Sequence, residues 1–404
     1  MNYDFTTVMD RKGKDALAVD ALGVTTDGFA PTAPREGFDI IPMWVADMNF
    51  PTAPSIIREV SERLRHPAFG YFATRPEYYD AVIRWQEKRN GVQGLLPEQI
   101  GYENGVLGGV MSALGALCTP GEAVLVHSPT YIGFTHSLAT GGYPIVHSPL
   151  VQDENGVYRM DFADMEEKIR SNQLRTVIFC SPHNPCGRVW ERWELEKAMA
   201  LFEKYDMRII ADEIWSDLLL HGNRHIPTQS VSAYARENTV ALYAPSKTFN
   251  LAGLIGSYHI IYNDALRQAV RQQAAKSHYN SMNVLSMYAL IGAYSEEGAQ
   301  WLAELLQVLG QNVDDACDFI EAELPLLRCF RPEGTYMLFV DCSAYCERYH
   351  ISLDEIEKRA WDVGVALQDG RMFHGPCHLR INLAVPNHRV KEAFRRLKEY
   401  VFVE

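Results

Sequence analysis

The chain has 404 residues, of which 47% are hydrophobic and 22% are charged, and its formal net charge is −13. This length exceeds the roughly 250–300 residues at which a single core stops growing, so we expect two domains in a globular protein. The negative charge argues against a nucleic-acid partner, because phosphate contacts need clustered Lys and Arg. The sequence starts without the basic and apolar regions of a signal peptide, and no apolar run approaches the length of a membrane span. We therefore expect a cytoplasmic protein without membrane contact.

Compact apolar runs that indicate strands alternate with segments of helical length through most of the chain. Such alternation predicts an α/β fold with a mainly parallel sheet flanked by helices, and the runs are typical of strands covered on both faces. The predicted helices are 105–118, 160–171 and 191–204, and the predicted strands are 123–127, 176–180, 208–212, 240–244 and 257–262.

The pattern changes after about residue 285. A long helical segment at 297–323 precedes a strand at 336–341, a helix, a strand at 378–383 and a final helix, which is typical of a smaller α+β domain. The first fifty residues are rich in Pro and Gly and weakly periodic. We therefore expect an N-terminal arm (1–50) that packs on the small domain, a large domain (51–285) and a C-terminal small domain (286–404).

The eight cysteines are scattered along the chain. In a large protein that is not secreted we expect them to stay reduced. Cys342 and Cys346 have the spacing of one half of a metal site, but no second pair of Cys or His accompanies them. The sequence therefore predicts structural thiols there and no bound metal.

Two charged side chains at or after the ends of predicted strands could take part in catalysis. Lys247 lies in Tyr-Ala-Pro-Ser-Lys-Thr-Phe-Asn (243–250), and a partly desolvated lysine amine has a lowered pKa and can form an imine. Taken alone, it is also consistent with a surface lysine. Asp212 closes the apolar strand at 208–212, where a buried carboxylate needs a cationic partner such as a protonated pyridine nitrogen; the alternative is a helix N-cap. Glu213 should point to the opposite side of the strand.

Two further segments suit polar ligands. In Ser-Pro-His-Asn-Pro-Cys-Gly (181–187) the prolines and the glycine fix a turn that holds the Asn184 amide at a strand end, where it could donate to a phenolate oxygen; the alternative is a plain turn. Asn-Gly-Val-Leu-Gly-Gly (104–109) opens a predicted helix, and the Gly105, Val106 and Leu107 amides could bind a phosphate there. This segment lacks the Walker lysine and the dinucleotide-binding glycine pattern, so a nucleotide is not indicated.

A phosphate cradle, a phenolate donor, a partner for a pyridinium and an imine-forming lysine are together what pyridoxal 5′-phosphate (PLP) requires. Their order and spacing resemble the fold-type-I PLP enzymes, the aspartate aminotransferase superfamily, over nearly the whole chain. Within that superfamily the chain is most similar to the MalY/PatB-type cystathionine β-lyases, which are C–S lyases. The segments that carry this likeness are Met-Trp-Val-Ala-Asp-Met (43–48), Phe-Gly-Tyr (69–71), Ser-Lys-Thr-Phe-Asn (246–250) and Pro-Glu-Gly-Thr-Tyr (332–336).

The resemblance implies a role for each cofactor-binding residue of the large domain. Lys247 would hold PLP as a Schiff base and act as the catalytic base, and Asp212 would keep the pyridine nitrogen protonated. Tyr131 would stack on the ring; the alternative is a core tyrosine. Ser246 and the amides of 105–107 would bind the phosphate.

The resemblance also implies the residues that bind substrate and a second subunit. Arg380 would grip the substrate α-carboxylate with a bidentate fork, together with Asn184; the alternative is a surface arginine at a strand end. Tyr71 would reach the cofactor phosphate of a neighbouring subunit, which implies an obligate homodimer with a shared active site. The alternative for Tyr71 is a tyrosine that flanks a helix.

The sequence departs from the family at five positions. Asn49 stands where the family usually has a second Asp, and Cys186 stands where Thr is common. Trp215 occupies the place of a Tyr or His that contacts the phenolate, so the phenolate would have one donor fewer. Ala244 and Ile255 replace a phosphate-binding Ser and Arg, so phosphate binding would rest on the groups already named.

The resemblance implies β-elimination from L-cystathionine or a related S-substituted cysteine, which gives a thiol, pyruvate and ammonia. The alternative is a class I/II aminotransferase acting on an L-amino acid, because both reactions share the loss of the α-proton. A third hypothesis is a protein of the same fold that serves as a binding or regulatory partner. The presence of both Lys247 and Asp212 argues against it.

Overall fold

The computed structural model of the chain describes residues 1–24, 30–276 and 281–403. By its contacts the chain divides into two units. Unit 1 contains Met1–Pro51, Asn184–Gly187 and Glu304–Glu404, and unit 2 contains Thr52–His183 and Arg188–Ala303. The domain boundaries at residues 50 and 285 stay a prediction. No helix within the described residues is long and apolar enough to cross a lipid bilayer.

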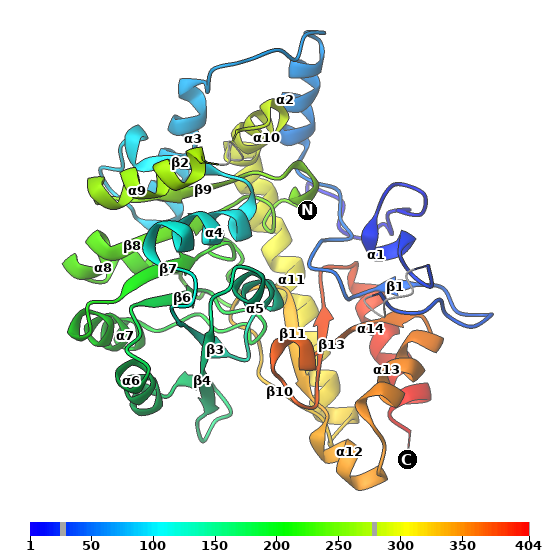
Figure 1. The fold of residues 1–404 in the computed structure, drawn as a ribbon. Coiled ribbons are helices and arrows are strands. Elements are labelled where there is room, and N and C mark those ends of the chain that lie inside the picture. The colour runs from blue at the N-terminus through cyan, green and yellow to red at the C-terminus, as the bar shows by residue number, and fades with distance from the viewer. Residues whose placement is uncertain (25–29, 277–280, 404) are drawn as a thin grey trace. The chain divides into compact units, whose positions relative to one another are not determined.

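Among the described residues, eight strands of unit 2 form one sheet in the order β2-β9-β8-β7-β6-β3-β4-β5 (Figure 1). The run from β8 to β4 is parallel, whereas β9, β2 and β5 are antiparallel to their neighbours. This confirms the predicted α/β fold with a mainly parallel sheet. The strands are β2 (Ile100–Glu103), β3 (Val124–Ser128), β4 (Ile145–Gln152), β5 (Tyr158–Met160), β6 (Thr176–Cys180), β7 (Arg208–Asp212), β8 (Thr239–Tyr243) and β9 (Ser257–Ile260).

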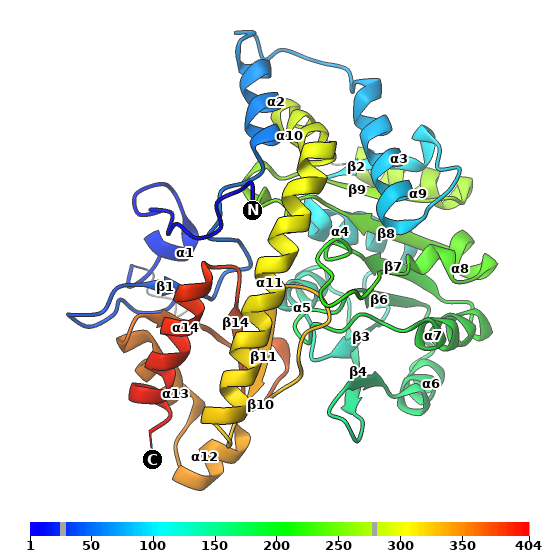
Figure 2. The ribbon, with the colours of Figure 1, turned by 180° about the vertical axis from the view of Figure 1, so that it is seen from behind.

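Helices cover both faces of this sheet (Figures 1 and 2). On one face α6 (Phe162–Ser171), α7 (Arg192–Lys204) and α8 (Ala233–Asn238) pack in a row, and on the other lie α4 (Gly105–Leu117), α5 (Ile132–Thr140) and α9 (Asp264–Ala275). The other helices of unit 2 in the described part of the chain are α2 (Pro54–Leu64), α3 (Pro76–Asn90) and α10 (Val284–Ala293), and α11 (Glu296–Glu323) begins there and continues in unit 1.

Strand β6 shows why all of its residues except Thr176 are apolar. Ile178 and Cys180 belong to the same buried cluster as Val106 of α4, while the ring of Phe179 meets the ring of Phe202 in α7 with 6.1 Å between centroids. Successive side chains of a strand point to opposite faces, so a strand between two helical layers needs apolar residues at every position.

Unit 1 is built on a four-stranded antiparallel sheet, in the order β10-β11-β14-β13 within the described residues. The strand β1 (Ile41–Pro42) pairs in parallel with β12 (Val365–Ala366), so the N-terminal segment contacts C-terminal elements inside this unit. The remaining elements are α1 (Leu17–Asp20), β10 (Arg328–Cys329), β11 (Met337–Asp341), α12 (Ser343–Tyr349), α13 (Leu353–Asp362), β13 (Gln368–Asp369), β14 (His378–Asn382) and α14 (Asn387–Arg396).

Candidate active site

Neighbouring parallel strands of unit 2 bring three of the predicted cofactor residues to one edge of the sheet. The strands β8, β7, β6 and β3 are adjacent and parallel, so the segments that follow them leave from the same edge. Asp212 is the last residue of β7, Lys247 follows the end of β8 by four residues, and Tyr131 follows the end of β3 by three. In open α/β sheets this carboxyl edge is where ligands bind.

Asp212 is a buried carboxylate with 4% of its surface exposed. Its Oδ1 accepts the Ile214 N–H at 3.0 Å, and a turn rather than a helix follows, so Asp212 is not a helix N-cap. Burial raises the pKa of Asp212 to about 7, although the Ile214 hydrogen bond and the charge of Lys247 act in the opposite direction. A further cation nearby would ionise this carboxylate. The ring nitrogen of PLP is such a cation, so Asp212 fits the group that the sequence implies.

Glu213, the next residue, has different partners. It accepts the Thr228 N–H at 2.8 Å and the Tyr243 hydroxyl, and it lies 2.7 Å from His225 Nε2. Burial acts to raise the pKa of Glu213, but His225, Tyr243 and Thr228 together lower it. The carboxylate is therefore engaged in a buried network of its own.

Lys247 lies in a tight turn after β8. The Phe249 N–H donates to the Pro245 carbonyl and the Leu251 N–H donates to the Ser246 carbonyl, each at 2.9 Å. Ser246 and Lys247 are half-buried, whereas the neighbouring Thr248 is completely buried. The turn thus fixes the backbone at Lys247 and leaves its side chain partly accessible.

The N-terminus of α4 offers room for an anion. Gly105 has a φ of 74°, which favours glycine, and nothing lies within 4 Å of the point where a Cβ would stand. Backbone N–H groups at the start of this 13-residue helix are free of intrahelical acceptors, so a phosphate fits here. The absence of a Cβ at Gly133 lets Tyr131 pack close to this end of α4. A Cβ on Gly133 would stand 2.4 Å from Tyr131 Cε1 and 2.8 Å from Leu107 Cδ1.

In unit 1, Arg380 and Asn184 lie together. Arg380 is in β14 with only 3% of its surface exposed, so it is not a surface arginine. It donates to the Trp44 carbonyl at 3.1 Å and to the Gln368 side chain, its guanidinium lies 4.2 Å from the centre of the Phe373 ring, and its Nη1 lies 3.5 Å from Asn184 Oδ1. These contacts orient the guanidinium.

The short segment that carries Asn184 is held by backbone hydrogen bonds. The N–H groups of Glu333 and Gly334 donate to the Gly187 carbonyl at 2.9 and 3.1 Å. Gly187 has a φ of 70°, and a Cβ there would stand 2.7 Å from Pro332 Cβ. The Asn-Pro-Cys-Gly and Pro-Glu-Gly-Thr-Tyr motifs of the sequence therefore fit against each other, which explains why the first motif ends in a glycine.

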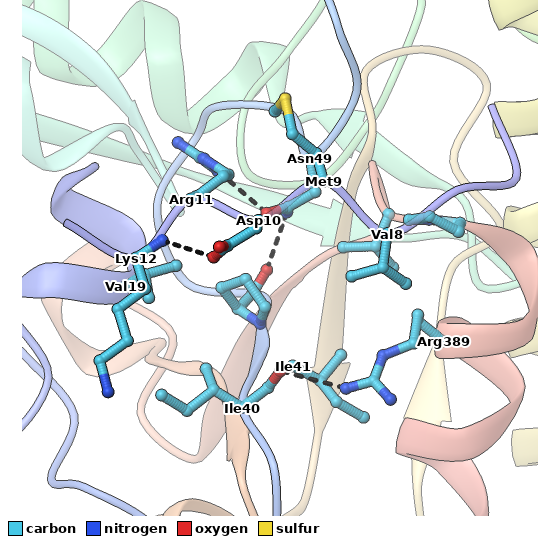
Figure 3. Close-up of a pocket in the computed structure, with 13 residues that line it drawn as sticks. Val8, Met9, Asp10, Arg11, Lys12, Val19, Ile40, Ile41, Asn49 and Arg389 are labelled. Atoms are coloured by element: carbon cyan, nitrogen blue, oxygen red, sulfur yellow. Dashed lines mark hydrogen bonds between the residues drawn. The ribbon is translucent and has the colours of Figure 1, made fainter. Parts of the chain in front are cut away.

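The departures from the family pattern have local consequences. Arg11 donates to Asn49 Oδ1 at 2.9 Å and pairs with Asp47 at 2.5 Å, so Asn49 keeps a hydrogen bond but removes one negative charge beside Arg11 (Figure 3). Asn49 lines a cavity of about 260 Å³ in unit 1 that is otherwise walled by residues of the N-terminal segment and by Val385, Pro386 and Arg389 (Figure 3). Trp215, Cys186 and Ala244 are buried, whereas Ile255 is 56% exposed.

Tyr71 is not brought to the other predicted residues. It lies in the loop between α2 and α3, where every residue from 65 to 73 is exposed, and its own side chain is fully exposed. Phe69 and Phe72 are exposed in the same loop. A side chain with this exposure contacts no other predicted site residue of its own chain.

Sequence reasoning missed several residues that support the site. Gln368 and Phe373 orient Arg380. Gly133 leaves space for the ring of Tyr131. Asp217 accepts a hydrogen bond from Thr248, the residue after Lys247. The polar Asp217, soon after an apolar strand, was the one visible signal. The others act through contacts between segments that no local pattern reveals.

The topology and the residues at the sheet edge define the fold of the fold-type-I PLP-dependent transferases. The sequence profile described as aminotransferase class I and II matches residues 39–397, and the chain belongs to this family.

The relatives include cystathionine β-lyases and C–S lyases, the group that the sequence resembles. The chain is 34% identical to the cystathionine beta-lyase PatB of Bacillus subtilis (strain 168) over 363 residues, which is 89% of this chain and 92% of that protein. The PLP-bound C-S lyase from Staphylococcus hominis has a TM-score of 0.88 and 31% identity, covering 100% of this chain and 99% of its own. Cystalysin from Treponema denticola, which contains PLP, has a TM-score of 0.89 and 28% identity, with 99% and 98% covered. The resemblance to MalY/PatB-type lyases is confirmed.

Proposed function

We propose that this chain is a PLP-dependent C–S β-lyase. It converts L-cystathionine or a related S-substituted L-cysteine, with water, into a thiol, pyruvate and ammonia. The observation that carries the proposal is the placement of Lys247, Asp212 and Tyr131 at one edge of the unit 2 sheet. The likeness to a cystathionine beta-lyase over most of both chains supports the choice of reaction.

Residues of unit 2 would hold the cofactor. Bound PLP supplies an aldehyde that takes up an amine and a ring that accepts the electrons of the Cα–H bond. Lys247 would hold the cofactor through its side-chain amine, and that amine would also remove the Cα proton of the substrate as a general base. Asp212 keeps the ring nitrogen protonated and Tyr131 packs on the ring. The amides of residues 105–107 and Ser246 bind the phosphate.

Residues of unit 1 would bind the substrate. The buried guanidinium of Arg380 receives the α-carboxylate, because its planar fork matches two carboxylate oxygens. Gln368 and Phe373 support this role, since they orient the fork before substrate arrives. Asn184 contributes its amide to the cofactor phenolate and to the substrate. Every L-amino acid carries this carboxylate, so Arg380 and Asn184 would bind L-amino acids in general and would not distinguish their side chains.

The proposal includes a homodimer in the cytoplasm. An exposed loop with Phe69, Tyr71 and Phe72 supports contact with a second copy of the chain, because contiguous exposed aromatic side chains mark interaction surfaces. Tyr71 would then reach the cofactor phosphate of the partner subunit. The cytoplasmic location rests on the sequence features described above.

Aminotransfer is the second candidate, because the matching family profile is that of class I and II aminotransferases. The two reactions differ in their products. The holoenzyme is incubated with L-cystathionine without any 2-oxo acid, and pyruvate and free thiol are measured over many turnovers. Continuous release of both in equal amounts supports the lyase. A reaction that stops after one turnover and resumes only when a 2-oxo acid is added would replace it with aminotransfer.

A further inference from the structure

Two half-buried cysteines of unit 1 lie side by side. The Sγ atoms of Cys346 in α12 and Cys377 just before β14 are 3.2 Å apart, although the residues are separated by 31 positions (Figure 2 labels α12 and β14). Both are free thiols in the structure. A disulfide needs about 2.05 Å between sulfurs, so the two atoms would have to approach by only about 1.2 Å.

The backbone holds this pair in the folded framework. The Cys342 N–H donates to the Cys377 carbonyl at 2.8 Å, and the Cys346 N–H donates to the Cys342 carbonyl at 2.9 Å. The adjoining ladder pairs Asp341 of β11 with His378 of β14. The first turn of α12 is therefore anchored on Cys377 itself, and the short distance belongs to a hydrogen-bonded junction rather than to two separate loops.

Cys346 and Cys377 are more accessible to solvent than a third cysteine nearby, Cys342. Cys342 is completely buried, whereas Cys346 and Cys377 are each partly exposed and within reach of a small molecule. Burial, followed by the contact with Cys377, raises the pKa of Cys346 to about 12. Since the thiolate is the attacking form, this shift disfavours Cys346 as the first nucleophile.

We propose that Cys346 and Cys377 are a site of reversible thiol–disulfide exchange with a low-molecular-weight disulfide. The Cys377 thiolate attacks one sulfur of the small disulfide, forms a mixed disulfide and releases one thiolate. Cys346 then attacks the Cys377 sulfur, forms the intrachain bond and releases the second thiolate. The protein loses two electrons and two thiol protons, and the small disulfide becomes two thiols. The inference is independent of the proposed lyase function.

The intrachain bond has a predictable consequence for stability. It would close a loop of 31 positions and so restrict the unfolded chain, which stabilises the folded state when the native geometry needs little adjustment. Arg380 lies three residues further along, but its guanidinium is held by Gln368 and Phe373. We therefore expect a more stable enzyme with an unchanged kcat.

The test uses the holoenzyme and oxidised glutathione as the probe. After incubation, remaining thiols are blocked with iodoacetamide, and peptides are mapped without reduction. The expected result is a linked peptide pair containing Cys346 and Cys377, which dithiothreitol removes. The oxidised enzyme should melt higher by on the order of a few degrees. Cys346→Ser should instead leave a glutathione adduct on Cys377.

A matched control comes from the second close pair of unit 1. Cys317 and Cys329 have their Sγ atoms 3.9 Å apart, and Cys329→Ser should still form the Cys346–Cys377 bond. Three results would overturn the proposal: no linked peptide in the wild-type enzyme, a stable glutathione adduct on wild-type Cys377, or a bond to Cys342 in place of Cys346.

Discussion

Thr248, the residue after Lys247, donates its hydroxyl to the carboxylate of Asp217, with 3.3 Å between Oγ1 and Oδ2. The other oxygen of Asp217 accepts the Trp85 indole N–H at 3.0 Å and lies 3.5 Å from Arg89 Nε. Four residues before Lys247, the Tyr243 hydroxyl donates to Glu213. Two buried carboxylates thus hold the chain on both sides of Lys247.

Asp217→Asn should destabilise the protein. An amide has one acceptor oxygen in place of two, so either the Trp85 indole or the Thr248 hydroxyl loses its acceptor. We expect the free energy of unfolding to fall by about 1–3 kcal/mol, measured by urea unfolding. Thr248→Val removes only one hydroxyl and should cost less. An Asp217→Asn protein with the wild-type midpoint would show that these bonds contribute nothing.

Asp212→Asn should change how stability depends on pH in the cofactor-free protein. The folded pKa of Asp212, about 7, lies above its usual value of 3.8, so the folded state binds more protons than the unfolded state between these values. The wild type therefore loses stability as pH rises from about 4 to 7, by roughly 4 kcal/mol in total, and the variant does not. Urea unfolding of both proteins at pH 5 and pH 8 should show about 2.7 kcal/mol of this difference. Added PLP should then stabilise the wild type more than the variant. If the two proteins differ in the free energy of unfolding by the same amount at both pH values, the pKa of Asp212 is not raised in the folded state.

Glu194→Gln should strongly destabilise unit 2. The side chains of Glu194 and Arg188 are both completely buried and form an ion pair at 2.5 Å. Removing the carboxylate charge leaves a buried guanidinium poorly compensated, at a cost of about 3 kcal/mol. The exposed pair of Arg192 and Glu196, 3.7 Å apart, supplies the control, and Arg192→Gln should change the midpoint very little. Equal effects of the two substitutions would refute the argument from burial.

Arg380→Lys should weaken substrate binding more than turnover. Lysine cannot form the bidentate contact, and the loss of a charge-assisted hydrogen bond of about 1.5–3 kcal/mol corresponds to a roughly 10- to 150-fold higher KM. Steady-state kinetics with L-cystathionine separate KM from kcat. Arg395→Lys, at an exposed position of α14, should behave as the wild type. If Arg380→Lys leaves KM unchanged, another residue binds the carboxylate.

Strands β3, β6, β7, β8 and β9 were predictable from the sequence, whereas β2, β4 and β5 were not. Every residue of β6 is buried and all but Thr176 are apolar, and the strand matches the predicted range of 176–180. In β4 several residues are exposed or half-buried, and His147, Ser148 and Pro149 interrupt the apolar pattern. Burial on both faces leaves a clear signature in composition, whereas a strand near the sheet edge is free to carry polar residues.

The site was predictable where one short motif carries the chemistry. Lys247 and Asp212 each end or follow an apolar strand, so the sequence places them at a sheet edge. The residues that orient Arg380 come from other segments: Gln368 is its partner across the β13–β14 ladder, and Phe373 lies in the turn between those strands. Such pairings depend on strand register, which the sequence of one strand does not specify.

Chemical trapping identifies the lysine that carries the cofactor. The PLP-loaded enzyme is reduced with borohydride, which makes the attachment of the cofactor permanent, and its peptides are mapped by mass spectrometry. We expect a pyridoxyl group on the peptide that contains Lys247, and we expect Lys247→Ala to release no pyruvate or thiol from L-cystathionine. A pyridoxyl group on a different lysine, or continued pyruvate release by Lys247→Ala, would contradict it.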